Sequence, residues 1–228
     1  MNDTLSKKQK TKTSPLVLFD FDGTLVSGDN GTRMIVMFAR SRIWPLVPMV
    51  TFCPIIFLFL FFPPTKHIGA SIFLWLSTVG MSKKKISQCL SRLAKYTASK
   101  PEHYVIQSAW QRLLTHQKNG DRVVVVTGCW EKQAKKTLKA LGLKNITVIG
   151  SRKKRWFGGY ISSPHCYGPD KIICLAENKI LPPWKAAYTD SFSDRHLFRL
   201  AKKCILVRPS DYSLKRMRKN FANIELLY

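Results

Sequence analysis

The run LVLFDFDGTL, at residues 16–25, constrains the fold more than any other part of this chain. Leu16–Phe21 has the length and the apolar, aromatic character of a β-strand that is buried on both faces. Gly23 ends this strand, because glycine reaches backbone conformations that other residues avoid. Asp20 and Asp22 are therefore expected at the carboxyl end of a strand, where open α/β sheets place their sites.

The spacing of the two carboxylates in this run is informative as well. Asp20 and Asp22 project toward one opening only if the chain turns at Gly23. Two carboxylates this close need a counter-charge to stay ionised, which favours a divalent cation with oxygen ligands. The alternative is a solvated turn that contains two acids, but the complete sequence DFDGTL after an apolar strand favours the cation site.

The composition limits the class of protein and its partners. The 228 residues suit one α/β domain with an insertion. Thirty-eight Lys and Arg against thirteen Asp and Glu give a formal charge of +25, which indicates nucleic acid, an anionic membrane or an acidic substrate as partner. Residues 1–14 are expected to form a mobile basic tail with no signal peptide. The six cysteines include no C-x-x-C pair, so we expect neither zinc nor disulfides, and a reducing, cytosolic environment.

A long apolar stretch follows the first motif. Residues 43–62 carry no charge and reach the length needed to cross a hydrocarbon core of about 30 Å. A second uncharged run, residues 68–81, would span only about 21 Å as a helix. Asp20 precedes both runs and the other candidate site residues follow them, so one active site requires an even number of membrane crossings.

Prolines and flanking charges indicate how this stretch could associate with a membrane. Pro45, Pro48 and Pro54 interrupt the first run as a straight helix. Basic residues flank the whole stretch, which favours both ends on the cytoplasmic side. We therefore expect residues 43–81 to form a re-entrant or interfacial helical hairpin in one leaflet. The alternative is an apolar helical insertion buried inside a cap.

The residues around this stretch have a helical pattern. Asp29 and Asn30 are expected to cap a helix that runs to about Arg42, with a position at the site entrance as the alternative for Asp29. Ser82 and Pro101 start two further helices, the second of which is expected to carry Val105 and Leu113 on one face. The chain thus divides into a catalytic core, residues 15–27 and 111–228, and a helical cap, residues 28–110.

A second strand and turn supply hydroxyl and amide donors. Arg122–Val126 is another doubly buried strand, and it leads to Thr127 and Gly128 before a helix expected at residues 130–141. A threonine hydroxyl and a glycine amide at a strand end can hold phosphate oxygens near the next helix N-terminus. Ordinary turn chemistry is the alternative.

The remaining candidates come after two more strands. Beyond a strand at residues 146–149, Lys171 begins a helix, where it is either a surface charge or a site residue. A strand at residues 184–188 then leads to Asp190 and Asp194, which can face one cation, the second through water or a neighbour. Asp194 could instead cap a helix.

Between these strands lies a strongly basic segment. The cations Arg152–Arg155 precede a β-hairpin that is expected to turn at Gly158-Gly159. Such a run is most often solvated, but beside an apolar segment it also suits anionic headgroups at about 1 kcal/mol per charge. Two last strands are expected at residues 204–207 and 224–226.

The order of these motifs resembles that of a known family. DFDGTL, Thr127-Gly128, Lys171 and TDSFSD match in order the four motifs of the haloacid dehalogenase-like phosphohydrolases. The resemblance covers residues 15–210 and implies a Rossmann-like parallel sheet with a helical cap inserted after the first strand. Thr189, where many relatives carry glycine, is a departure that affects only the geometry of that loop. The apolar segment, SIFLWLSTVGMS and YTDSFSD are also similar to the membrane-associated phosphatidylglycerophosphatase C subfamily.

The resemblance implies a role for each carboxylate. Asp20 would attack phosphorus and form an aspartyl-phosphate, while Asp22 would protonate the leaving alkoxide and later deprotonate water. Mg²⁺ would be held by Asp20, the backbone carbonyl of Asp22 and Asp190, and would neutralise charge on the phosphoryl group. Asp194 would act on the cation indirectly, through water or a neighbouring residue.

The resemblance also implies the phosphate-binding groups, and the formal charge and the apolar stretch add a hypothesis about the substrate. Thr127 and the Gly128 amide would hold phosphate oxygens, and Lys171 would stabilise the nucleophile. We expect phosphatidylglycerophosphate, an anionic phospholipid, to be dephosphorylated to phosphatidylglycerol on the cytoplasmic side of the inner membrane, with Arg33 and Arg40 as candidate headgroup contacts.

Two other functions stay open. One is a soluble phosphomonoesterase similar to phosphoserine phosphatase. The other is a non-enzymatic basic protein that binds nucleic acid. No recognised nucleic-acid motif accompanies the basic runs, so no specific nucleic-acid partner is expected.

Overall fold

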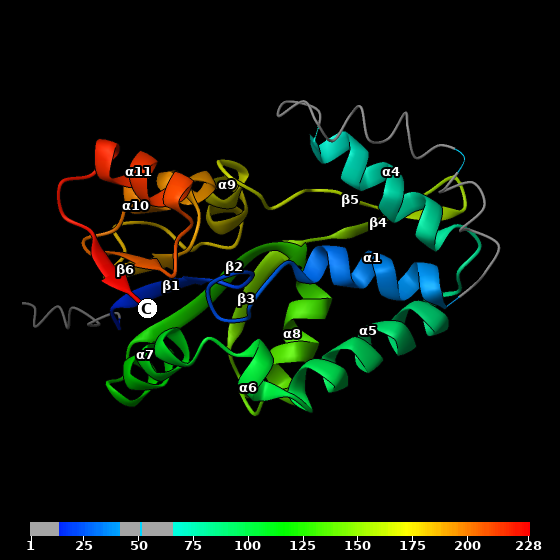
Figure 1. Cartoon of the computed structure of the whole chain (residues 1–228), viewed down its shortest axis with the longest axis horizontal. Helices are drawn as coiled ribbons and strands as arrows, with labels where there is room; N and C mark the ends of the chain where they lie inside the picture. The colour runs from blue at the N-terminus through cyan, green and yellow to red at the C-terminus, as the bar shows by residue number, and fades with distance from the viewer. Residues whose placement is uncertain (1–13, 42–50, 52–65) are drawn as a thin grey trace, which may run out of the picture.

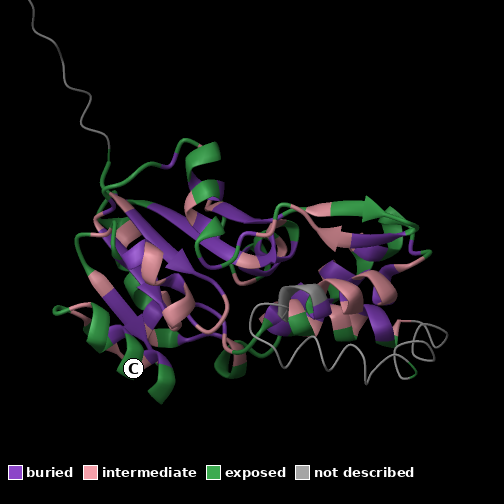
Figure 2. Cartoon of the chain, turned by 90° about the horizontal axis from the view of Figure 1, so that it is seen from above, coloured by how far each residue is buried: buried purple, intermediate pink, exposed green. Residues whose placement is uncertain are grey.

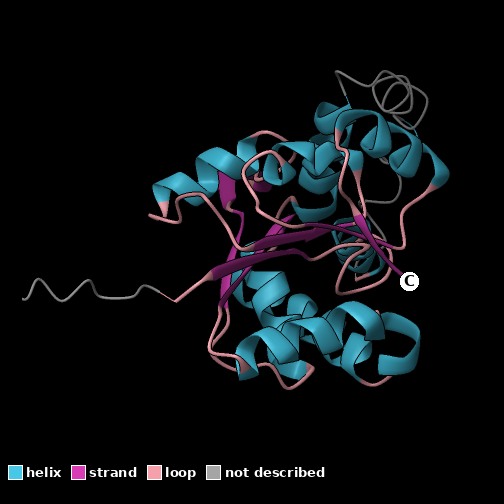
Figure 3. Cartoon of the chain, turned by 90° about the vertical axis from the view of Figure 1, so that its left-hand side faces the viewer, coloured by secondary structure: helices cyan, strands magenta, loops and turns pink. Residues whose placement is uncertain are grey.

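Six parallel strands form the main sheet, in the order β3-β2-β1-β6-β7-β8. The computed structural model describes residues 14–41, 51 and 66–228. Strands β1 and β6 are central neighbours, and helices cover both faces of the sheet (Figures 1 and 3). The strands are β1 (Leu16–Asp20), β2 (Arg122–Trp130), β3 (Thr147–Ser151), β6 (Ala186–Thr189), β7 (Cys204–Val207) and β8 (Glu225–Leu227).

Burial on both faces explains why the sequence of strand β1 is apolar at successive positions instead of alternating. Val17 and Phe19 face one hydrophobic core, whereas Leu18 faces a second core on the opposite side of the sheet. Because successive side chains of a strand point to opposite faces, a strand covered on both sides must be apolar at every position. The ring of Phe19 stacks on Tyr188 of β6, with centroids 4.1 Å apart.

Each core is completed by helices. On one face, α7 (Gln107–Lys118) and α8 (Glu131–Ala140) contribute Ala109, Leu113, Ala134 and Leu138. On the other face lie α9 (Asp170–Glu177), α10 (Arg195–Phe198) and α11 (Asp211–Asn220). The sheet is therefore buried between two helical layers (Figure 2). This arrangement confirms the predicted parallel α/β fold.

A helical insertion follows β1, as predicted. Its described helices are α1 (Asn30–Arg40), α4 (Lys66–Thr78), α5 (Lys83–Ala98) and α6 (Pro101–Tyr104). Helices α1, α4 and α5 form a third core, to which Phe38, Leu74 and Leu90 belong. Trp130 and Tyr160 also enter this core, although neither belongs to the insertion.

Tyr160 comes from a separate two-stranded hairpin, formed by β4 (Lys153–Trp156) and β5 (Gly159–Ser162). This hairpin packs against α4 at the end of the molecule that carries the insertion (Figure 1). The insertion therefore shares its core with a segment from outside residues 28–110. The boundaries of cap and core at residues 28 and 110 stay a prediction.

Three local predictions differ from the structure. The single helix expected after Pro101 is wrong, because Val105 forms a bridge with Val26 and splits it into α6 and α7. Strand β2 does not end at Val126 but continues through a bulge to Trp130. The hairpin turns at Phe157 and Gly158, one residue earlier than expected, since Trp156 and Gly159 still pair. The Ser82 cap is confirmed: its side chain accepts a hydrogen bond from the Lys85 amide.

The two apolar runs are described only in part. The first, residues 43–62, lies outside the described residues apart from Thr51, as do residues 1–13 of the basic tail. The second forms α4, whose Leu74 is buried in the core of the insertion. None of the helices in the described part of the chain is both long enough and apolar enough to cross a bilayer. The predicted membrane hairpin over residues 43–81 stays a prediction.

Candidate active site

The carboxyl ends of β1, β2 and β6 bring the predicted site residues together. Asp20 is the last residue of β1, Thr127 lies in β2, and Asp190 directly follows β6. These strands are neighbours in one parallel sheet, so their carboxyl ends share one edge. Lys171 lies near the start of α9, which packs on one face of the sheet, and its side chain extends to the same edge.

Lys171 is the centre of a buried ionic group. Its Nζ donates to Asp20 Oδ1 and to Asp194 Oδ2, both at 2.6 Å. Lys171 and Asp194 are only 2% and 1% exposed, which contradicts the alternative that Lys171 is a surface charge. Burial alone would lower the pKa of Lys171, but the carboxylates of Asp194 and Asp20 raise it above its ordinary value. Lys171 therefore remains a cation.

Asp194 orients this lysine and does not act as a helix cap through its side chain. Its Oδ2 also accepts a hydrogen bond from Thr189 Oγ1 at 2.9 Å, and it makes no side-chain cap bond to α10. Thr189 thus has a bonding role that a glycine at this position could not supply. The other oxygen, Oδ1, is buried without a partner among the described residues.

Asp22 is held by Asn30, the first residue of helix α1. Its Oδ1 accepts hydrogen bonds from the Asn30 backbone amide at 2.8 Å and from Asn30 Nδ2 at 2.9 Å. Its Oδ2 accepts a longer bond from Thr127 Oγ1 at 3.3 Å. Burial raises the pKa of Asp22 to about 6, although the bonds from Asn30 oppose that shift. A carboxyl group with this pKa can both donate and accept a proton near neutral pH.

Asp190 lies directly against the turn that carries the two aspartates. Gly23 has φ +74°, and a Cβ on this residue would lie 2.3 Å from Asp190 Oδ2. A glycine is therefore required both for the backbone conformation and for the approach of Asp190. Burial raises the pKa of Asp190 to about 6, and the Asp194 carboxylate adds to the shift.

The donor set fits a divalent cation such as Mg²⁺. Asp20 and Asp194 bond to Lys171, and Asp190 and Asp22 also lie close enough to Asp20 to raise its pKa, so carboxyl groups outnumber the one cation. Burial raises the pKa of Asp20 well above its ordinary value; Lys171 opposes the shift, and the other three carboxylates increase it. In the described residues no three His, Cys, Asp or Glu side chains converge as a preformed cage. The predicted set needs only two carboxylates and the Asp22 carbonyl, all hard oxygen donors of the kind Mg²⁺ prefers.

The predicted phosphate-binding residues are close to Asp22. Thr127 Oγ1 bonds to Asp22 and accepts from the Cys129 amide at 3.0 Å. A Cβ on Gly128 would lie 3.3 Å from the Tyr167 ring, so the aromatic side chain covers this glycine. Helix α8 begins at Glu131, within one residue of the prediction.

Sequence reasoning missed three supporting residues. Asn30 was expected only as part of a helix start, yet it bonds to Asp22 twice. Thr24 donates to Asp20 Oδ2 at 3.3 Å, and Thr189 donates to Asp194. Thr24 and Thr189 belong to the motifs, so their position beside the aspartates was the available signal. Asn30 carried no such signal.

The predicted headgroup contacts lie outside this cluster. The guanidinium of Arg33 lies over the ring of Tyr104, 4.5 Å from its centroid. Arg40 is exposed in the last turn of α1. Asp29 caps α1 by accepting from the Thr32 amide, which confirms the helix-cap interpretation.

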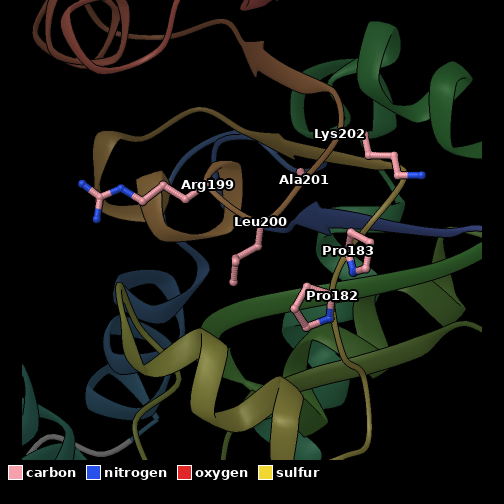
Figure 4. Close-up of a pocket in the computed structure, with 6 residues that line it drawn as sticks. All are labelled: Pro182, Pro183, Arg199, Leu200, Ala201 and Lys202. Atoms are coloured by element: carbon pink, nitrogen blue, oxygen red, sulfur yellow. The ribbon is translucent and has the colours of Figure 1, made fainter.

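A surface pocket of about 410 Å³ lies elsewhere (Figure 4). Its lining precedes β6 and β7, so it is at the amino ends of those strands, opposite to the carboxylates. The lining contains no carboxylate, histidine, serine or cysteine: Pro182, Pro183, Arg199, Leu200, Ala201 and Lys202. It is not a second candidate for the chemistry.

Comparisons with known proteins give a family and a fold. Several solved structures share the fold at low sequence identity, and no curated protein matches the sequence. A protein of unknown function from Bordetella pertussis Tohama I has a TM-score of 0.70 at 15% identity, covering 93% of this chain and 99% of that one. A substrate-bound phosphoserine phosphatase has a TM-score of 0.57 at 16% identity, with 94% and 93% covered.

A phosphoserine phosphohydrolase-like protein from Francisella tularensis is similar as well, with a TM-score of 0.56 at 12% identity over 93% and 94% of the two chains. These likenesses concern the fold alone. The family is shown by the sequence: the family model for haloacid dehalogenase-like hydrolases matches residues 17–199, most of the chain. With its parallel sheet, its insertion after β1 and its cluster of strand-end carboxylates, this chain belongs to the haloacid dehalogenase-like hydrolase family.

Proposed function

We propose that the protein is a phosphomonoester hydrolase that acts through an aspartyl-phosphate on Asp20. The observation that carries this proposal is the pairing of Asp20, bonded to Lys171 at 2.6 Å, with a second carboxyl group two residues away whose pKa is about 6. The first group is suited to attack and the second to proton transfer. One similar structure, at 16% identity and a TM-score of 0.55, is a phospho-aspartyl intermediate analogue of phosphoserine phosphatase.

The chain's own residues account for each proton and charge. Asp20 attacks phosphorus while Lys171 holds its other oxygen and reduces the repulsion between carboxylate and phosphate. Asp22 gives its proton to the leaving alkoxide, so the alcohol departs neutral. Asp22 then takes a proton from the water that attacks the aspartyl-phosphate, which releases inorganic phosphate and restores both carboxyl groups.

The other site residues orient the phosphate. Thr127 Oγ1 and the Gly128 amide are placed to donate to phosphoryl oxygens beside Asp22. Mg²⁺ bound by Asp20, the Asp22 carbonyl and Asp190 would supply charge neutralisation for the transferring group. Thr24 and Asn30 hold the two aspartates in their orientations.

A small, water-soluble phosphomonoester is the first candidate substrate. The similar solved structures include phosphoserine phosphatases that resemble this chain over more than nine-tenths of its length. A phospholipid monoester, phosphatidylglycerophosphate, is the second candidate. It is favoured by the uncharged residues 43–62 and by the formal charge of +25.

One assay tests the chemistry and separates the substrates. Phosphate release is measured with Mg²⁺ from phosphoserine in solution and from phosphatidylglycerophosphate in mixed micelles, with Asp20→Asn as the blank. Asp20→Asn should abolish turnover and leave the fold intact. Turnover of either substrate within tenfold of wild type in that variant would exclude Asp20 as the nucleophile. Preference for the lipid would reverse the order of the two candidates.

A further inference from the structure

The β4–β5 hairpin presents two aromatic side chains to solvent at its tip. Phe157 is 78% exposed and Trp156 is 49% exposed, and their rings contact each other at a centroid distance of 4.8 Å. No other large apolar side chain of the described residues is as exposed as Phe157. The two adjoining rings form an exposed apolar patch, and contiguous patches of this kind can mark interaction sites.

The backbone at the tip is unfavourable for the residue it carries. Phe157 has φ +38° and Gly158 has φ +78°, which are the conformations of a tight hairpin turn. Glycine and asparagine suit such positions, whereas a bulky aromatic residue there is strained. The hairpin thus keeps an aromatic group at its apex at a cost in stability, which indicates a function for that group.

The tip is also rigidly supported. Trp75 of α4 donates its indole N–H to the Trp156 carbonyl at 2.9 Å, and the Gly80 amide donates to the Gly158 carbonyl at 2.9 Å. The ring of Trp75 fills the space that a side chain on Gly159 would need. The exposure of the two aromatic rings is therefore a fixed feature of the fold.

The same hairpin is strongly basic. Arg152, Lys154 and Arg155 are exposed, and none forms an ion pair with a carboxylate among residues 14–41 and 66–228. Lys153 lies over the Tyr160 ring; burial lowers its pKa, and Lys132 and Lys83 lower it further. Lysines from α5 and α8 therefore add to the positive field of β4.

We propose that the β4–β5 hairpin is a docking surface for an anionic phospholipid bilayer. Trp156 and Phe157 would enter the interfacial region while the flanking cations contact the headgroups. Aromatic rings and Lys or Arg side chains both favour that interface, and each cation adds to the attraction of an anionic leaflet. A convex tip next to the apolar helix α4 suits a flat bilayer better than it suits the groove that a nucleic-acid strand requires.

The location of the hairpin relates this surface to the active site. Strand β4 begins two residues after β3 ends, so the hairpin leaves the sheet from the edge that carries the carboxylates. Its β5 strand is joined to the segment after the phosphate-binding residues, because Trp130 Nε1 donates to Ser162 Oγ at 2.9 Å. The docking surface goes beyond the proposed catalysis and does not depend on it.

Vesicle sedimentation with the full chain tests this proposal. The vesicles are phosphatidylcholine alone or phosphatidylcholine mixed with phosphatidylglycerol. Phe157→Asn removes the more exposed of the two rings and suits the positive φ, so it should keep or raise the unfolding temperature while weakening binding to the anionic vesicles about tenfold or more. Lys154→Gln with Arg155→Gln should weaken it about twenty-five-fold, about fivefold for each charge.

A matched control comes from the opposite end of the molecule. Arg218→Gln with Lys219→Gln removes the same charge from exposed positions on α11 (Figure 1), and this variant should bind as wild type does. Equal loss in the control, or wild-type binding by both hairpin variants, overturns the proposal. If the hairpin variants lose binding to a single-stranded RNA oligonucleotide but still bind the vesicles, the proposal is overturned in favour of a nucleic-acid surface. Thermal unfolding checks the fold of every variant and needs no catalytic activity.

Discussion

Gly23→Ala separates the backbone role of Gly23 from its role in placing Asp190. The new Cβ would lie 2.3 Å from Asp190 Oδ2, whereas an ordinary contact begins at 3.4 Å, so the carboxylate must retreat by about 1 Å. A displacement of about 1 Å in a catalytic group can cost about a hundredfold in rate. The positive φ of +74° adds about 1–2 kcal/mol of strain for alanine. We expect both a loss of stability and a fall of about a hundredfold in kcat.

Gly120→Ala is the matched control for this experiment. Gly120 has φ +76°, and a Cβ there would meet nothing within 4 Å. It should lose a similar amount of unfolding free energy in urea titrations, about 1–2 kcal/mol for alanine in this conformation, and keep full activity. The assay is Mg²⁺-dependent phosphate release from a soluble phosphomonoester. Gly23→Ala activity within tenfold of the Gly120→Ala value would refute the placement of Asp190 at the catalytic turn.

Three further substitutions test other parts of the structure. Lys171→Met leaves two buried carboxylates without their cation, so unfolding free energy in urea should fall by about 3–5 kcal/mol at neutral pH; a loss below about 1 kcal/mol would contradict the buried ion group. Asn30→Ala removes one of two hydrogen bonds on Asp22 Oδ1, and kcat should fall about tenfold with thermal unfolding little changed; unchanged kcat would exclude a positioning role. Burial acts to raise the pKa of Asp121, but hydrogen bonds from Lys185 and His116 bring it below its ordinary value. The ionised Asp121 therefore stabilises the fold above the unfolded-state pKa of about 4. This stabilisation is lost as pH falls through the lower folded-state pKa. Asp121→Asn should therefore cost about 1–3 kcal/mol at pH 7 and less at pH 3, and an equal cost at both pH values would contradict this.

Much of the fold could be predicted because its strands carry strong local signals. Leu16–Phe19 and Val123–Val126 are apolar at every position, and short uninterrupted runs of this kind are typical of strands covered on both faces. The parallel order of the strands then brings their carboxyl ends to one edge, which accounts for the meeting of Asp20, Thr127 and Asp190. Lys171 could be placed only through the resemblance, since a lysine near a helix start is usually solvated.

The parts that sequence reasoning missed depend on long-range pairing. The break between α6 and α7 is due to the bridge between Val26 and Val105, two residues far apart in the chain. Helical periodicity after Pro101 contains no trace of that bridge. Likewise, the hairpin residue Tyr160 completes the core of an insertion that ends well before it. Neither contact changes the local pattern from which helices and strands are inferred.

The distribution of charge favours an enzyme over a basic binding protein. Only thirteen residues of the chain are acidic, yet Asp20, Asp22, Asp190 and Asp194 are gathered at one sheet edge. Burial raises the pKa of Asp20, Asp22 and Asp190, so their ionised forms are destabilised by their surroundings. A protein selected only to bind polyanions gains nothing from this cluster, because its negative field opposes such a ligand. The cluster is accounted for if a cation and a phosphoryl group occupy it during turnover, while the remaining positive surface attracts the anionic substrate.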